Sequence, residues 1–185
     1  MKTSTWAVLC AILFTVGLVA ERLHGQDVPR PGKQHDALKQ MEGTWDAVAR
    51  FAAGPGKPMA ESKGVETATL SLGGFWLIYD YKGERNGQPF TGRGSLGYDQ
   101  QRQKYVGTWI DSSKSGLLLS EGTADEQGKV FTMIVQGYGD AEGRAIAIKQ
   151  VMEIKDRDSR KLTLVSPSPD GKDVPVGTIE YTRRK

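Results

Sequence analysis

Beyond Thr44 the chain is a succession of short segments in which apolar and polar residues alternate, joined by turns only a few residues long. The turns have hairpin chemistry: Asn86-Gly87 is one, Asp125 to Gly128 is another, and Pro169 to Gly171 is a third. No connection between these segments reaches the dozen or so residues that a parallel crossover requires. The strands must therefore run antiparallel in the order of the sequence, as an up-and-down meander.

About ten strands of this kind fit between Thr44 and the C-terminus. They are expected at Thr44–Ala53, Lys63–Leu72, Phe75–Gly83, Gln88–Tyr98, Lys104–Ser112, Leu117–Ala124, Val130–Tyr138, Arg144–Lys155, Lys161–Ser166 and Val174–Arg183. Laid flat, such a sheet would leave two unpaired edges, and closing it into a barrel removes both. The expected fold is therefore all-β, an antiparallel meander closed into a β-barrel, with a two-sheet sandwich as the alternative.

Residues 92–97, Gly-Arg-Gly-Ser-Leu-Gly, match the G-x-G-x-x-G pattern of dinucleotide-binding proteins. That motif must follow a strand and open a helix, so that the helix N-terminus meets the phosphates, but here a second strand follows. The first two glycines instead share a strand face with Phe90, Leu96 and Tyr98. Glycine in such a position marks a bend or a place where something packs close to the backbone. The segment 54–58 lacks the Gly-Lys-Ser/Thr of a P-loop, so no nucleotide cofactor is expected.

The N-terminus precedes the barrel and is typical of an exported protein. Lys2 is followed by an uncharged apolar run from Trp6 to Ala20, which is shorter than the roughly 20 residues of a membrane-spanning helix. We predict a signal peptide over residues 1–20, cleaved between 20 and 25, a flexible leader over 21–34 and a single barrel domain over 35–185. The protein is then secreted or periplasmic and keeps no integral membrane segment after cleavage.

Charge and cysteine content exclude several classes of function. The 25 basic and 22 acidic residues are interspersed and give a net charge of +3, so a nucleic-acid partner is not expected. Cys10, the only cysteine, lies in the predicted signal peptide, which excludes thiolate catalysis, disulfides and cysteine-ligated metals from the cleaved protein. The only histidines, His24 and His35, both precede the strands, and no metal site or other cofactor is expected.

A short helix is expected immediately ahead of the first strand. Asp36 can cap it, Leu38 and Met41 share one face, and Gly43 can end it. His35 would precede this helix.

The alternation of the strands assigns the side chains that point into the barrel. Every second residue from Ile146 to Ile154 faces inward, as does every second residue from Phe75 to Tyr81. Some inward positions carry polar atoms, and these define the candidate ligand-binding residues: Tyr79, Tyr81, Trp109, Glu121, Gln136 and Gln150, with Asp111 as a further inward carboxylate. An apolar cavity with a few placed polar groups fits this set. A filled barrel in which these groups bond to each other or to water fits it equally well.

The helix that leads into Gly43-Thr44-Trp45 resembles the N-terminal signature of the calycin superfamily, which includes lipocalins and fatty-acid-binding proteins. This resemblance implies that Gly43 and Trp45 are structural and that the tryptophan packs across the closed end of the barrel. Residues 72–81 (LGGFWLIYDY), 96–99 (LGYD) and 105–109 (YVGTW) are similar to the family named domain of unknown function 1579. That resemblance covers residues 33–185 and implies small, often exported bacterial proteins with a lipocalin-like barrel, but no activity or catalytic residues.

The leading interpretation is a barrel that binds a small apolar or weakly polar ligand. Fatty-acid carriers of related barrels hold a carboxylate with inward arginines. No arginine falls on a clearly inward face here, and Arg93 is expected to point outward. We therefore expect a neutral or weakly polar ligand rather than a fatty acid. Haem needs an axial ligand, usually histidine, which no strand supplies, although tyrosine ligation stays open.

Two alternatives come from other classes of function. A packed barrel would serve as a structural or partner-binding envelope protein, with Trp76 and Ile78 as a contact patch if they are exposed. A carboxylate-based enzyme is less favoured: Asp111 and Glu121, on neighbouring strands, would act as acid and base. The oligomeric state is left open.

Overall fold

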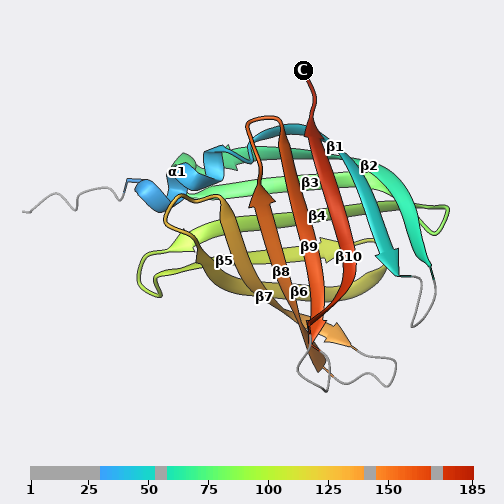
Figure 1. Ribbon diagram of the computed structural model, residues 1–185. Helices are drawn as coiled ribbons and strands as arrows, with labels where there is room; N and C mark the ends of the chain where they lie inside the picture. Colours follow the sequence, from blue (N-terminus) through green and yellow to red (C-terminus); the bar gives the residue numbers. More distant parts are fainter. Residues whose placement is uncertain (1–29, 53–57, 140–144, 168–172) are drawn as a thin grey trace, which may run out of the picture.

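The computed structural model of the protein describes residues 30–52, 58–139, 145–167 and 173–185. Within them, one α-helix precedes ten strands that close into a single barrel (Figure 1). The elements are α1 (Lys33–Lys39), β1 (Gly43–Ala52), β2 (Met59–Ser71), β3 (Trp76–Arg85), β4 (Gln88–Asp99), β5 (Lys104–Asp111), β6 (Lys114–Ala124), β7 (Val130–Gly139), β8 (Ala145–Ile154), β9 (Ser159–Pro167) and β10 (Asp173–Arg183), with a 3-10 turn at Leu72–Gly74. The predicted signal peptide and residues 21–29 of the leader lie outside the described residues.

Each strand pairs antiparallel with the next along the chain, and β1 pairs with β10 to close the sheet. The closing register places Trp45 opposite Arg183 and Ala47 opposite Tyr181. The expected meander and closed barrel are thus confirmed, and the sandwich alternative is wrong.

The strands follow the predicted order but several are longer than predicted. β2 begins at Met59 rather than Lys63, and β6 begins at Lys114 rather than Leu117, because hairpin pairing continues toward the turns. The turn at Asn86-Gly87 has φ values of 53° and 72°, the left-handed conformation that a tight hairpin needs. The inward alternation predicted for β3 and β8 is confirmed, since Leu77, Tyr81, Ile148 and Ile154 are all buried.

Helix α1 lies across one end of the barrel, against β3 and β4 (Figure 1). The Tyr105 hydroxyl donates a hydrogen bond of 2.8 Å to the Gln34 carbonyl, and the Gln40 side chain donates one of 3.1 Å to the Gly128 carbonyl. Leu38 and Met41 lie on one face, as predicted, and this face points into the barrel, where both are almost fully buried. We call this end of the barrel the closed end.

The predicted helix boundaries are wrong by a few residues. The helix begins at Lys33, so His35 lies inside it, and Asp36 forms an ion pair of 2.7 Å with Lys39 instead of capping the helix. It ends at Lys39 rather than at Gly43, which opens β1 with a φ of 126°. No helix among the described residues is long and apolar enough to cross a membrane.

Candidate functional site

The barrel is hollow and contains a partly open cavity of about 530 Å³. Seven aromatic side chains contribute to its wall: Phe51, Tyr79, Tyr81, Phe90, Trp109, Tyr138 and Tyr181. A smaller chamber of about 80 Å³ adjoins it toward the closed end, where Met41, Leu77 and Phe131 form the lining. Both volumes share Glu66, Tyr79, Ser120, Gln150, Leu162 and Tyr181 as lining residues, so they lie next to each other inside the barrel.

Two glycines of β4 make room for the flat aromatic wall of this cavity. A Cβ atom on Gly92 would lie 2.1 Å from the Trp109 ring, and one on Gly94 would lie 2.3 Å from the Tyr79 ring. The two rings stack with their centroids 6.0 Å apart and their planes inclined by 22°. The Gly-Arg-Gly-Ser-Leu-Gly motif is therefore a strand segment on which aromatic rings pack, as the sequence predicted, and not a turn before a helix.

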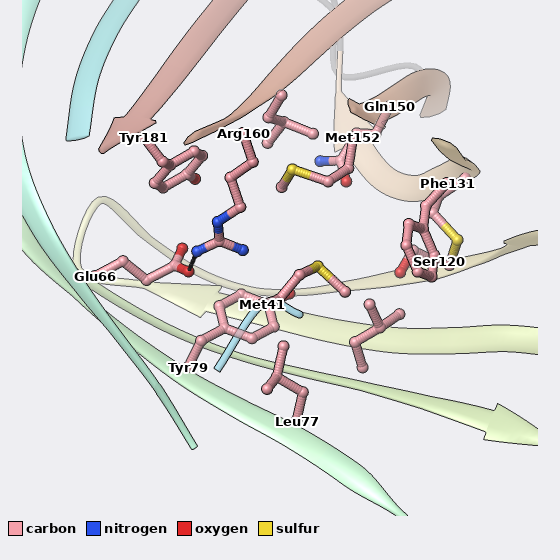
Figure 2. A pocket seen from close by; sticks show the side chains of 13 residues that line it. Met41, Glu66, Leu77, Tyr79, Ser120, Phe131, Gln150, Met152, Arg160 and Tyr181 are labelled. Carbon is pink, nitrogen blue, oxygen red and sulfur yellow. Dashed lines mark hydrogen bonds and ion pairs between the residues drawn. The ribbon is translucent and has the colours of Figure 1, made fainter. Parts of the chain in front are cut away.

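A buried ion pair lies where the two volumes meet. Arg160 of β9 is 3% exposed and Glu66 of β2 is 5% exposed, and Nη2 of the arginine donates a hydrogen bond to Oε1 of the glutamate (Figure 2). The guanidinium carbon lies 4.3 Å from the ring centroid of Trp45 and 4.4 Å from that of Tyr181. These contacts hold the charged group in place, and a buried pair of this kind tolerates the loss of neither partner alone.

Tyrosine side chains surround the ion pair and remain neutral. Burial raises the pKa of Tyr79 and Tyr181 well above the usual range, and the negative charge of Glu66 raises it further. The same two causes raise the pKa of Tyr81. The inner part of the cavity therefore offers neutral phenols beside one carboxylate and one guanidinium.

At the other end, the cavity reaches the hairpins that follow β3 and β5. Asp111 accepts hydrogen bonds from the Trp109 indole at 3.0 Å and from the Ser113 amide at 2.9 Å. Burial alone would raise the pKa of Asp111, but the hydrogen bonds from Ser113 and Trp109 outweigh it and lower the pKa. Lys114 lies 4.5 Å from the centroid of the Tyr138 ring. Because Glu84 and Arg85 also line this end, its charges are mixed.

Comparison with known proteins places the chain in a family. The model of the family described as "Protein of unknown function (DUF1579)" matches residues 30–183. The chain belongs to this family. No curated protein matches its sequence.

Two solved structures share the barrel of this DUF1579 protein. One is Rv2717c from M. tuberculosis, with a TM-score of 0.60 and 16% identity, over 83% of this chain and 99% of that chain. The other is the S-type phycobiliprotein lyase CPES from Guillardia theta, with a TM-score of 0.54 and 13% identity, over 84% of this chain and 99% of that chain. At these identities the likeness concerns the fold.

Four of the six predicted ligand-binding residues of this DUF1579 barrel line the cavity: Tyr79, Tyr81, Trp109 and Gln150. Asp111 lines it as well. Gln136 does not. Phe131, Met133 and Val135 are the inward residues of β7, so the alternation places Gln136 on the outer face, where it is exposed. A β-bulge between Val135 and Tyr138 then turns Tyr138 inward. The inward assignment of Gln136 is thus wrong.

Glu121 lies on the outer face of β6 and does not reach the cavity. It forms ion pairs with Arg102 and with Lys104, the latter at 2.8 Å, and the Lys104 hydrogen bond lowers its pKa. Its strand neighbour Ser120 lines the cavity instead. Asp111 and Glu121 therefore face opposite sides of the sheet and cannot act together as acid and base.

The expectation that no arginine points inward is wrong. Arg93 does point outward and pairs with Asp80 at 2.7 Å, but Arg160 points into the barrel. The predicted ninth strand began at Lys161, one residue too late to include Arg160. Glu66 was also missed, although it precedes Ala68 and Leu70 at a spacing of two and so shares their inward face.

The structure also shows the location of three further residues that the sequence analysis singled out. His35 is buried between Phe75 and Tyr98, with ring centroids 5.1 and 6.0 Å away, and does not line the cavity. Trp45 is fully buried and its indole donates a hydrogen bond of 3.0 Å to the Met41 carbonyl. Trp76 is half-buried because its ring packs over Gly97, so it does not form the exposed patch that was considered.

Proposed function

We propose that this protein binds one small, flat and mostly apolar molecule inside its barrel. The observation that carries the proposal is the cavity of about 530 Å³, because ligand sites typically measure roughly 300–1,000 Å³ and combine an apolar wall with a few polar groups. The stacked Tyr79 and Trp109 rings favour a planar ligand, since a flat ring packs well against such a wall.

The experiment is native mass spectrometry of the protein purified from its own cells without denaturation. An additional mass that is released by organic solvent identifies the ligand. Recovery of the bare polypeptide, together with no binding of flat aromatic compounds in calorimetry, would contradict the proposal.

A matched pair of variants on β7 tests whether the ligand binds inside the cavity. Val135 is buried and lines the cavity, whereas its neighbour Ile134 is 40% exposed on the outer face. Val135→Trp fills part of the cavity and should abolish retention of the ligand, and Ile134→Trp should leave it intact. Circular dichroism of both variants verifies that each one folds.

We further propose that the protein is exported and binds its ligand in the periplasm or outside the cell. Lys2 and the apolar run from Trp6 to Ala20 support this proposal. Cell fractionation with N-terminal sequencing tests it, and an intact Met1 on cytoplasmic protein would contradict it.

A further inference from the structure

In the buried ion pair, the guanidinium of Arg160 has hydrogen-bond donors that Glu66 does not use. The guanidinium uses Nη2 for Glu66, while its Nε is buried and has no hydrogen-bond partner within the described residues. Unsatisfied buried donors are costly, and in native proteins they call for an explanation such as a bound group. Figure 2 shows the other terminal nitrogen of Arg160 turned away from Glu66, toward the lined space.

The position of the pair suits recognition of a ligand. Glu66 lines both the large cavity and the small chamber, and Arg160 lines the chamber. The Gln150 amide and the Ser120 hydroxyl line both volumes as well. A molecule that extends inward along the Tyr79–Trp109 wall therefore meets this polar group at its inner end.

The charges of the pair select among polar ligands. A carboxylate drawn to Arg160 would be repelled by Glu66, which already neutralises the arginine, and a cation would be repelled by Arg160. A neutral group with an N–H next to a C=O satisfies both residues, because the carbonyl accepts from the guanidinium while the N–H donates to the carboxylate.

We propose that Glu66 and Arg160 recognise a lactam- or amide-type edge on a flat, neutral ring system. This inference rests on the proposed function and names the chemical class of its ligand. The buried phenols of Tyr79 and Tyr181 surround this edge and add no charge.

The test is isothermal titration calorimetry of the full chain with four bicyclic probes of similar size. These are a quinolone lactam, its N-methyl derivative, naphthoate and naphthalene. The lactam should bind at least about tenfold more tightly than its N-methyl derivative, since a hydrogen bond to a charged group is lost. The lactam should also bind at least about tenfold more tightly than naphthoate. Equal binding of lactam and N-methyl derivative, or tightest binding of naphthoate, would overturn the inference.

Glu66→Gln provides a reversal test. It leaves the charge of Arg160 without its carboxylate, so the preference should shift at least about tenfold toward naphthoate. The matched control is Glu121→Gln on the outer face, which should leave the ranking of the probes unchanged. An unchanged ranking in a folded Glu66→Gln variant contradicts the inference. If that variant does not fold, the ranking in the wild-type protein decides.

The outcomes separate this inference from the proposed function. Naphthalene has no hydrogen-bonding group and reports on the cavity alone. Binding of naphthalene without any preference for the lactam overturns the role of Glu66 and Arg160 and leaves the proposed function standing. Absence of binding by all four probes contradicts both.

Discussion

The guanidinium carbon of Arg160 lies 4.3 Å from the ring centroid of Trp45. Arg183 approaches the same indole, with its guanidinium carbon 4.0 Å from the ring centroid. Arg183 also donates hydrogen bonds to the carbonyls of Gln40 and Glu42 in the segment between α1 and β1. Trp45 therefore contacts both Arg183 at the closed end of the barrel and Arg160 in the buried ion pair. Its role extends beyond filling the core.

Trp45→Phe should destabilise the protein by about 2–3 kcal/mol. The substitution removes the hydrogen bond to Met41, leaves a void in a fully buried position and weakens two cation–π contacts. Chemical denaturation measures the change in the free energy of unfolding. The control is Trp76→Phe on the outer face, which is half-buried and should cost less than about 1 kcal/mol. Equal losses of stability for the two substitutions would show that the contacts of Trp45 with Met41, Arg160 and Arg183 do not add to stability.

Arg160→Met should cost about 3–5 kcal/mol, because it leaves the carboxylate of Glu66 buried and without its partner. The double variant Glu66→Gln/Arg160→Met should be more stable than Arg160→Met alone, since it removes the orphaned charge. Urea denaturation of the double-mutant cycle measures this coupling. The exposed Arg93–Asp80 pair serves as the control, and Arg93→Met should cost far less than Arg160→Met. Additive costs at Glu66 and Arg160 would contradict the coupling.

Much of the fold could be predicted from the sequence, because short hairpin turns and period-two alternation are local signals. The order of the strands and the closure of the barrel follow from them, since an antiparallel meander of this length removes its edges by closing. The inward orientation of Tyr79, Tyr81 and Gln150 follows from the same alternation. Local patterns thus sufficed where one face of a strand is clearly more apolar than the other.

The candidate site was less predictable where a strand is apolar on both faces, as β6 and β7 are, or where a strand boundary matters. β7 carries apolar residues on both faces near its start, so its pattern does not show that Val135 faces inward and Gln136 outward. The bulge after Val135, which turns Tyr138 inward, is set by pairing with β8, and no local pattern reports it. Arg160 was missed because its strand begins two residues earlier than its apolar core suggested. The contact between Arg160 and Glu66 joins strands 94 positions apart in sequence, so its existence depends on the closed barrel.

Gly94→Ala should narrow the cavity and disturb its aromatic wall. The new methyl group would lie 2.3 Å from the ring of Tyr79, so the ring must move from its stack with Trp109. We expect a loss of about 1–3 kcal/mol in stability and a change in the near-ultraviolet circular dichroism. Gly116→Ala is the matched control, because the nearest atom to its Cβ is the side chain of Lys114 at 3.8 Å. An unchanged aromatic spectrum in Gly94→Ala would argue against the close packing.

The tyrosines predict how the protein responds to alkali. Burial raises the pKa of Tyr105 to about 12, and burial with the charge of Glu66 raises those of Tyr79 and Tyr181. A raised pKa means that the folded state prefers the neutral phenol. This contribution to stability is therefore complete below about pH 10, where unfolded tyrosine ionises, and is lost as the pH rises toward the folded values.

Absorbance at the tyrosinate band, followed together with far-ultraviolet circular dichroism, measures this titration. Part of the six-tyrosine signal should appear only above about pH 12, together with unfolding. Glu66→Gln removes a negative charge beside Tyr79 and Tyr181 and should shift that late part to lower pH, whereas Glu121→Gln on the outer face should not. Complete titration near pH 10 with the fold intact would place these phenols in water and contradict a buried tyrosine cluster around the ion pair.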